Sequence, residues 1–412
     1  MSTRIQNWLA NGLICAAVAL PSFAIAAEQL IIDYVVSNTP QRKALLTIID
    51  QFAAANPDIQ VKHNGYPQEP YKKDFINRLK TGRADLAFWY AGERLRDAAE
   101  HKLLAPLDAD LVALLKKKKF APATIEGTRV GGEVYGFPLY YYAWGFVYRK
   151  SLFNRLDIRP PATWAEFQQA CERLKAAGIT PFGLGAKSIW PAAGWFDYLN
   201  LRINGIDFQR KLLRGDVRFT DPKVRQVFDT WGDLLRKGYF LEATMDQEME
   251  RVLPYLYRNH VGMVLMGSFI AAKFPGAIAS DMGFFPFPSY SPDIPNYEEA
   301  PLDVLVLPTT GVNHRARNRF LTYLVESGSL RMIADADQTF AAQPDLQSPA
   351  LLGEATNSIL SNAAGLTYFF DRDAKTELVG PTYEGLRLFL KPPHDTEQAV
   401  QHIEKARHKG KE

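Results

Sequence analysis

The first hundred residues alternate between short apolar runs and segments whose apolar residues recur at helical spacing. Leu30–Val36, Ile59–His63 and Ala84–Tyr90 predict strands, because they are short, apolar and bounded by turn residues. An apolar face between residues 45 and 52 and the segment Tyr71–Lys80 predict the helices between them. This order is a βαβ pattern, which predicts a largely parallel sheet covered by helices.

The most aromatic run of the chain is Phe137–Lys150, FPLYYYAWGFVYRK, which follows the glycine-rich segment GGEVYG. It is too short for a membrane helix, which needs about 20 apolar residues. We interpret it as a buried strand that passes from one lobe to another beside a binding cleft. The pattern leaves an ordinary core strand open as the alternative.

Later segments continue the mixture of helices and strands. Thr163 and Glu166 fit a capping box at the start of a helix. Val261–Met266 and Pro301–Pro308 are apolar strand signals, and the second is interrupted by Asp303. A lone buried acid is unfavourable unless it is hydrogen-bonded, so Asp303 needs a partner or a ligand. Pro301–Pro308 is then a second segment expected to cross between lobes.

Composition and charge fit a globular protein that is long enough for two cores. The chain has 412 residues, of which 47% are hydrophobic and 23% charged. The net charge of +3 is small beside 48 basic and 45 acidic residues. Neither a nucleic acid nor an anionic membrane is therefore expected as a partner.

The N-terminus has the pattern of an export signal over residues 1–26. An apolar segment at 9–20 follows a modest positive charge, and small residues at 24–26 form a cleavage site. Removal of the signal would leave Cys171 as the one cysteine, so no disulfide is expected within a chain. The expected location is the periplasm.

Motifs of catalysis and metal binding are missing from the sequence. There is no G-x-S-x-G, no H-E-x-x-H and no complete P-loop, and the seven histidines have no metal-ligand spacing. Acids such as Asp371 and Asp373 are too common a pattern to indicate a hydrolase. We expect no enzyme, no metal and no cofactor.

Candidate binding residues follow from where ligands lie in open α/β sheets, which is beyond the carboxyl ends of the strands. Thr39 is expected to cap the first helix. The candidates come from the loops after the strands, the tryptophan-containing segment at 187–195, the G-S turn after Val261–Met266, the aromatic run and the lone acid of the second crossing segment. They are Ser37, Asn38, Gln68, Glu69, Trp89, Glu93, Arg94, Tyr140, Tyr142, Lys187, Trp190, Trp195, Gly267, Ser268, Phe269 and Asp303.

Five segments carry a resemblance when they are taken together and in order. They are DLAFWYAGERLRDAAEHKLLAPLD, YGFPLYYYAWGFVYRKSLF, RPPATWAEFQQACERLKAAGITP, GMVLMGSFI and TYFFDRD. With the export signal and the early βαβ unit, the chain resembles the extracellular solute-binding proteins of family 1. These are the sugar-binding proteins of ABC importers related to maltose-binding protein. The resemblance covers residues 28–408.

The resemblance implies a periplasmic-binding-protein fold of two α/β lobes, each with a mostly parallel sheet, joined by a hinge of crossing segments. The implied lobes are residues 27–138 with 306–349, and 139–305 with 350–412. The lobes would close on a sugar, and the protein, as a monomer, would dock on the permease subunits of an ABC transporter in the inner membrane.

The resemblance also implies roles for particular residues. The loops after the second and third strands match sugar-holding loops, Trp190 and Trp195 look like an aromatic wall, and Asp371 and Arg372 match a segment that borders the cleft. Phe269 stands where a stacking tryptophan is common, which keeps a stacking face and removes the indole donor.

The residue types fit a sugar, whose C–H faces pack on aromatic rings and whose hydroxyls bind carboxylates, amides and guanidinium groups. Two alternatives stay open. One is a receptor for a polyamine or an organophosphate, which would want a cleft dominated by one sign of charge. The other is an exported carbohydrate-active enzyme, which shares the same residue types.

Overall fold

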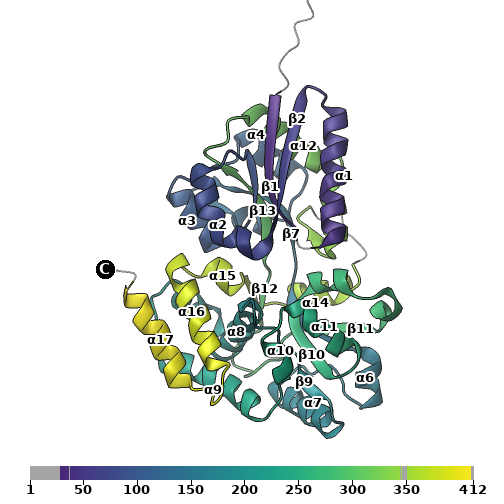
Figure 1. Cartoon of the computed structure of the whole chain (residues 1–412), viewed down its shortest axis with the longest axis vertical. Helices are drawn as coiled ribbons and strands as arrows, with labels where there is room; N and C mark the ends of the chain where they lie inside the picture. Colours follow the sequence, from purple (N-terminus) through teal and green to yellow (C-terminus); the bar gives the residue numbers. More distant parts are fainter. Residues whose placement is uncertain (1–27, 37, 344, 346–349, 410–412) are drawn as a thin grey trace, which may run out of the picture.

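The structure is a computed structural model that describes residues 28–36, 38–343, 345 and 350–409. They form two α/β lobes, one above the other in Figure 1, joined by a narrow waist through which strands pass. The two-lobed α/β fold expected from the sequence is confirmed. The predicted export signal at 1–26 and Ser37 lie outside the described residues.

The first lobe is built on a seven-stranded sheet. Its strands are β1 (Glu28–Val36), β2 (Ile59–Pro67), β3 (Leu86–Tyr90), β4 (Leu104–Ala105), β7 (Gly136–Tyr141), β13 (Leu302–Pro308) and β14 (Phe340–Ala341). They lie in the order β14, β7, β13, β3, β1, β2, and β4 pairs with the end of β13. A separate small hairpin consists of β5 (Arg129–Val130) and β6 (Glu133–Val134).

Helices cover both faces of this sheet. They are α1 (Thr39–Ala55), α2 (Gln68–Thr81), α3 (Glu93–Glu100), α4 (Ala109–Lys117), α5 (Pro122–Glu126), α12 (His314–Glu326) and α13 (Ser329–Asp337). On one face, α1, α12 and α13 pack on strand residues that include Phe88. Successive strand residues point to opposite faces, so the next residue, Trp89, stacks on Phe75 of α2.

The second lobe has a four-stranded sheet in the order β11, β8, β10, β9. Its strands are β8 (Trp144–Arg149), β9 (Thr180–Phe182), β10 (Val261–Gly267) and β11 (Met282–Phe285), and β12 (Tyr297–Glu299) pairs apart from them with β15 (Gly365–Thr367). Among the described residues, the α-helices of this lobe are α6 (Lys150–Arg155), α7 (Trp164–Ala176), α8 (Trp190–Leu213), α9 (Pro222–Arg236), α10 (Glu242–Met245), α11 (Met249–Tyr257), α14 (Gly353–Ser361), α15 (Phe370–Asp373), α16 (Thr376–Phe389) and α17 (Thr396–Lys409).

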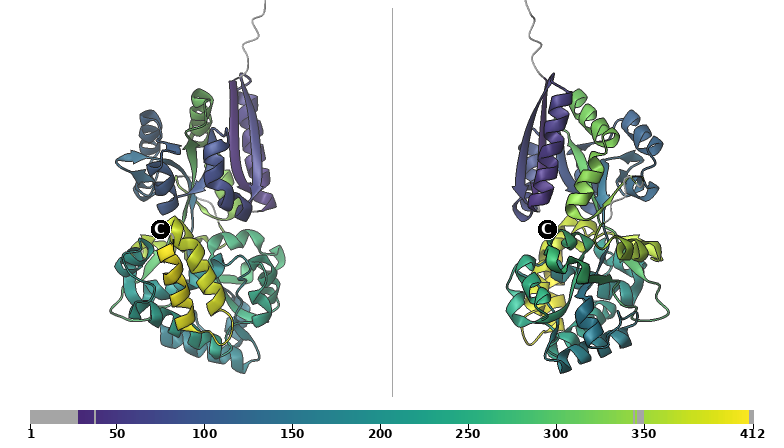
Figure 2. Two further views of the ribbon diagram at one scale, coloured as in Figure 1. Left: turned by 60° about the vertical axis from the view of Figure 1, so that its left-hand side comes forward. Right: turned by 90° about the vertical axis from the view of Figure 1, so that its right-hand side faces the viewer.

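Two 3-10 helices complete the second lobe, η1 (Ser268–Lys273) and η2 (Gly276–Asp281). Helices α16 and α17 lie side by side on its outer surface, in yellow in Figure 2. None of the described helices combines the length and the apolarity that crossing a bilayer requires.

The prediction of mostly parallel sheets is wrong, because both sheets are mixed. In the first lobe β1 is parallel to β2 and β3, as the βαβ pattern predicts, but β13 is antiparallel to β3 and β7. In the second lobe β9 is parallel to β10, whereas β8 is antiparallel to both of its neighbours. The chain leaves the first lobe along β7 and returns along β13, so the two crossing strands run in opposite directions.

The aromatic run at Phe137–Lys150 crosses between the lobes, but as two strands instead of one. It begins in β7 of the first sheet, passes through Tyr142 and Ala143, and continues as β8 of the second sheet. The expected lobe boundaries at 138 and 306 fall inside β7 and β13, which both belong to the first sheet. By sheet membership, these two segments change lobe at 142–143 and at 300–301.

Candidate functional site: a cavity between the lobes

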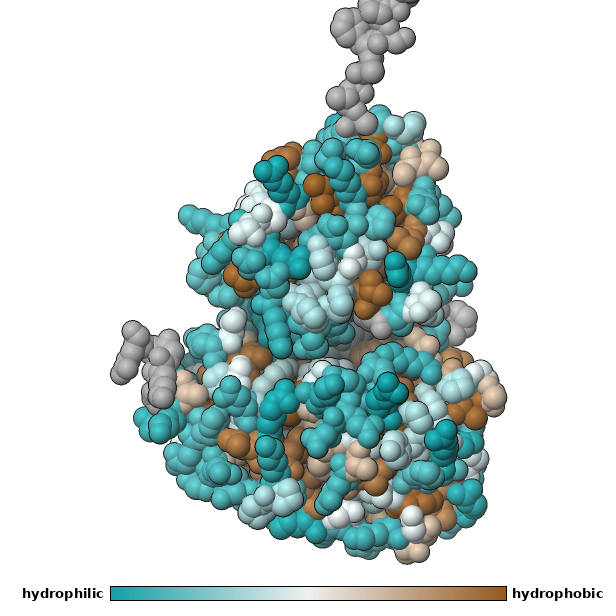
Figure 3. All heavy atoms as spheres, viewed as in Figure 1, coloured by the Kyte–Doolittle hydropathy of each residue, from teal (hydrophilic) through white to brown (hydrophobic). Residues whose placement is uncertain are grey.

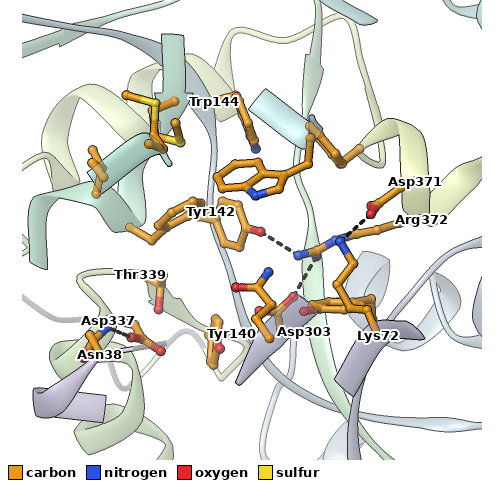
Figure 4. Close-up of a pocket in the computed structure, with 18 of the residues that line it drawn as sticks. Asn38, Lys72, Tyr140, Tyr142, Trp144, Asp303, Asp337, Thr339, Asp371 and Arg372 are labelled. Carbon is orange, nitrogen blue, oxygen red and sulfur yellow. Dashed lines mark hydrogen bonds and ion pairs between the residues drawn. The ribbon is translucent and has the colours of Figure 1, made fainter. Parts of the chain in front are cut away.

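A cavity of about 940 Å³, its open mouth included, lies between the two lobes and is lined by residues of both. On the face drawn in Figure 3 a furrow separates the lobes, and the surface around it is mainly hydrophilic. The crossing strands β7, β8 and β13 pass beside this cavity, and their side chains point into it (Figure 4).

Alternate residues of the crossing segment line the cavity. Tyr140, Tyr142 and Trp144 are lining residues, whereas Tyr141 points the other way and stacks on Phe340 with ring centroids 5.7 Å apart. This follows from the period of two in extended backbone. The aromatic run therefore supplies both a packing face and a cavity face.

Arg372 of α15 is the central charged group of the cavity (Figure 4). Its Nη1 donates to Asp303 Oδ1 at 2.7 Å, and its Nη2 donates to Tyr142 Oη at 2.7 Å. The guanidinium also lies 4.0 Å from the ring centroid of Tyr90. Burial alone would lower the pKa of Arg372, but Asp303 beside it raises that pKa above its ordinary value. Asp303 thus has the partner that its burial requires.

A second ion pair joins the two lobes directly. Lys72 of α2 in the first lobe donates to Asp371 Oδ2 of α15 in the second lobe at 2.5 Å. Burial would raise the pKa of Asp371, but the positive charges of Lys72 and Arg94 hold it below its usual value. Asp371 is therefore ionised at neutral pH and fixed beside Arg372.

The start of α1 contributes an amide to the first-lobe wall. Asn38 is the N-cap of α1, where its Oδ1 accepts from Gln41 N at 2.7 Å, so the expectation that Thr39 caps this helix is wrong. Asn38 Nδ2 in turn donates to Asp337 Oδ1 at 2.8 Å. Burial raises the pKa of Asp337 to about 6. Asp337 and Thr339 both line the cavity.

Aromatic rings form the second-lobe wall. Trp144 stacks on Phe369 with centroids 5.0 Å apart, and Trp190 meets Trp144 edge to face at 6.0 Å. Phe269 meets Tyr142 edge to face at 5.0 Å. Trp190 and Phe269 are partly exposed, so their rings have surface available to a ligand.

The structure brings only part of the predicted site together. The predicted residues that line the cavity are Asn38, Gln68, Tyr140, Tyr142, Trp190, Phe269, Asp303, Asp371 and Arg372. The predicted residues that do not line it, Ser37 apart, are Glu69, Trp89, Glu93, Arg94, Lys187, Trp195, Gly267 and Ser268.

The two tryptophans in that second group are core residues. Trp89 lies against Phe75 with ring centroids 3.5 Å apart, because its side chain points to the α2 face of the sheet. Trp195 is 0% exposed and packs edge to face on Phe182 at 4.9 Å. Neither ring can stack on a ligand in the cavity.

The polar residues of that group lie behind or beside the cavity. Glu69 is 3.4 Å from Lys72, Glu93 pairs with Arg96 at 3.0 Å, and Arg94 lies close enough to Asp371 to lower its pKa. Lys187 is exposed and lies 3.9 Å from Glu248. Gly267 and Ser268 are buried at the start of η1 and position Phe269.

Several lining residues were not in the predicted set: Lys72, Phe88, Tyr90, Trp144, Met249, Glu250, Met266, Ile270, Lys273, Asp337, Thr339 and Phe369. Lys72 could have been found, because it follows Gln68 by four residues and so shares its helix face. Asp337 is the last residue of α13 and Thr339 follows two residues later, in a stretch where no local pattern indicates a site.

The charge pattern and the cavity define a class of protein, a two-lobed receptor that encloses a small solute between its lobes. No group of three or more histidine, cysteine, aspartate or glutamate side chains among the described residues could hold a metal ion. The chain belongs to the bacterial extracellular solute-binding proteins, because the model of that family matches residues 37–329.

Comparison with known proteins places the chain among such receptors. It is 26% identical over 281 residues to an ABC transporter extracellular-binding protein of Pyrococcus horikoshii, and it spans 64% of that relative's length. The solved structure of the bacterial solute receptor AcbH, described as preferring β-D-galactopyranose exclusively, superimposes with a TM-score of 0.84 at 26% identity. That match covers 93% of this chain and 99% of AcbH.

A second solved structure, of a chitin oligosaccharide binding protein, matches with a TM-score of 0.83 at 20% identity. It covers 92% of this chain and 98% of that protein, and it supports the fold.

Proposed function

We propose that this protein is the substrate-binding component of an ABC importer and that it captures a sugar or a short oligosaccharide between its lobes. The observation that carries this proposal is a cavity in which aromatic faces lie beside charges that are already paired. A sugar needs both features, since its C–H faces pack on rings and its hydroxyls bind fixed polar groups.

The pairing of charges argues against an ionic solute. Each cationic side chain among the lining residues is joined to a lining acid: Lys72 to Asp371 at 2.5 Å, Arg372 to Asp303 at 2.7 Å, and Lys273 to Glu250 at 2.5 Å. The remaining lining acid, Asp337, is held by the amides of Asn38 and Gln41. A phosphate would require unpaired cations and a polyamine unpaired acids, whereas a neutral polyol can bind the outer lone pairs and protons of these groups.

The relatives support the remaining parts of the proposal. Both comparisons at 26% identity are with extracellular binding proteins or solute receptors, so we propose export to the periplasm by the signal at 1–26 and delivery to permease subunits of an ABC transporter. The protein would act as a monomer without catalytic turnover, and it would close around the sugar.

The test is a titration of the purified protein with galactose, glucose, xylose, N-acetylglucosamine, maltose, raffinose, spermidine and glycerol phosphate. Heat of binding and tryptophan fluorescence are read together, since Trp144 and Trp190 line the cavity. We expect saturable binding of at least one sugar and no product by chromatography. Turnover of a sugar would establish the enzyme instead, and a response confined to spermidine or glycerol phosphate would replace the sugar with an ion.

A further inference from the structure

Two carboxyl groups lie side by side behind the aromatic wall of the cavity. Asp197 of α8 and Glu299 at the end of β12 are each 0% exposed. The two carboxyl groups lie close enough that each affects the pKa of the other, and Asp197 is next to Tyr198, whose Oη accepts from Glu299 N at 3.4 Å. A fully buried carboxylate that accepts no hydrogen bond, beside a second buried acid, is strongly unfavourable when ionised, so we infer that the pair holds one proton.

The hydrogen bonds around the pair show which partner holds that proton. Asp197 Oδ1 accepts from Gln209 Nε2 at 2.6 Å, and Asp197 Oδ2 accepts from the backbone N–H of Phe370 at 2.6 Å. Asp197 is thus placed as the charged acceptor. Neither carboxyl oxygen of Glu299 receives a hydrogen from a donor group in the described part of the chain. The proton therefore belongs to Glu299, which donates it to Asp197.

Among the residues that the structure describes, no cation beside the pair is free to neutralise a second negative charge. The charged and titratable groups that face the pair are Glu298, Tyr198, Asp373, Arg372 and Tyr142. Glu298 is itself paired with Arg202 at 2.5 Å, and Arg372 is engaged by Asp303. Burial raises the pKa of both carboxyls, and the charge of Asp197 raises that of Glu299 further.

The pair joins three segments that each supply a residue to the cavity. Asp197 lies on α8, which begins with Trp190, and Glu299 lies just before β13, which carries Asp303. The N–H that Asp197 accepts belongs to the first residue of α15, which carries Arg372. A change in the distance between the two carboxyls would therefore move these segments relative to one another.

We propose that Asp197 and Glu299 share one proton and act as positioning residues, which hold α15 and β13 in the arrangement that binds solute. This proposal rests on the function proposed above. Loss of the proton would place a second negative charge within a hydrogen bond of the first, and the repulsion would displace Phe370 and the Arg372–Asp303 pair that follows it. Solute binding would weaken as the pH rises, and it would recover when the pH is lowered again.

The variant that isolates the proton is Glu299→Gln, because a glutamine amide donates permanently to Asp197 and cannot titrate. The probe is galactose, or the member of the sugar panel that binds more tightly, and calorimetry is run from pH 6 to pH 9. We expect the parent to weaken by up to about tenfold per pH unit above the titration of the pair. The variant should match the parent at pH 6 and stay constant to pH 9.

Two other acids near the cavity require control variants. Asp337 and Asp373 have pKa values raised by burial to about 6, so they titrate in part of the same range. Asp337→Asn and Asp373→Asn should keep the weakening at alkaline pH. If Glu299→Gln fails to fold, Asp197→Asn takes its place, since it also leaves one carboxyl in the pair. Identical pH profiles of the parent and these pair variants would overturn the proposal.

A measurement without solute keeps this proposal separate from the sugar function. The infrared spectrum of the ligand-free protein at neutral pH should contain a protonated-carboxyl band that is missing from the spectrum of Glu299→Gln. If no sugar binds, the proposed function is wrong. The infrared band then still tests, by itself, whether the pair holds a proton. Absence of a difference between the two spectra would overturn the shared proton even if sugar binds.

Discussion

Arg372 Nη1 lies 2.7 Å from Asp303 Oδ1, so a guanidinium of the second lobe is ion-paired with a crossing strand of the first-lobe sheet. Both side chains are less than a tenth exposed. In such a place, the removal of one partner leaves a buried charge without compensation. The pair therefore has consequences both for the fold and for the cavity.

Asp303→Ala is expected to lower the free energy of unfolding by about 3–5 kcal/mol, because it leaves Arg372 buried and unpaired. Urea unfolding measures this loss, and calorimetry with the best sugar of the panel should show no binding. The double variant Asp303→Leu with Arg372→Met removes both charges, so it should regain most of the stability without regaining the binding. Recovery of sugar binding in the double variant would contradict a role for the pair in the cavity.

Trp190 and Trp195 are expected to respond oppositely to replacement. Trp190→Ala removes an aromatic face at the cavity and should weaken sugar binding by about 1 kcal/mol with a small change in stability. Trp195→Ala opens a hole in the second-lobe core and should lower the free energy of unfolding by about 3–5 kcal/mol. Calorimetry and urea unfolding are run on both variants. Equal effects on binding would place Trp195 back in the cavity.

The difference between these tryptophans shows how far the sequence could lead. The alternation of strands and helices predicts an α/β sheet, and the family resemblance implies two lobes. The period of two predicts that only alternate residues of the crossing run face the cavity. Trp190 and Trp195 are five residues apart on α8, which is about 140° around a helix. Helical geometry could therefore have shown that the two rings cannot face the same ligand. The prediction of one aromatic wall rested only on the presence of two nearby tryptophans.

The missed residues have a different cause. Asp337 and Thr339 reach the cavity because α13 and β14 return to the sheet beside β7, a contact between segments about two hundred residues apart. No local pattern in the sequence predicts a contact between segments so far apart. The antiparallel direction of β13 in the first-lobe sheet also could not be predicted from a local pattern, because it depends on the path of the chain through the second lobe. Both features require the folded chain.

Lys72→Met should destabilise the protein in a way that depends on pH. The folded-state pKa of Asp371 is lowered because Lys72 and Arg94 oppose its burial, so this contribution to stability is present above the unfolded pKa and is lost as the pH falls. Without Lys72, the deficit should be about 3 kcal/mol from pH 7.5 down to the unfolded pKa of 3.8, and it should shrink below that value, for example at pH 2.5. Urea unfolding at the two pH values measures it.

Lys73→Met is the matched control for Lys72→Met, because Lys73 is the next residue of α2 and is exposed. It should leave stability and sugar binding unchanged at both pH values. A deficit of equal size at pH 7.5 and pH 2.5 would mean that Lys72 acts through packing of its side chain and not through the charge of Asp371.

Tyr142→Phe tests whether the crossing segment takes part in binding through its hydroxyl. Tyr142 Oη accepts from Arg372 Nη2 at 2.7 Å, and its loss leaves that donor unpaired in a buried place, which costs about 1–3 kcal/mol. A sugar hydroxyl could accept the hydrogen bond from Arg372 Nη2 in place of Tyr142. The loss of stability should therefore be larger in the ligand-free protein than in the complex with sugar. Calorimetry and thermal unfolding with and without sugar separate the two.

Tyr141→Phe, on the opposite face of β7, is the control and should match the parent in both measurements. An equal loss of stability with and without sugar would show that no ligand hydroxyl reaches Arg372.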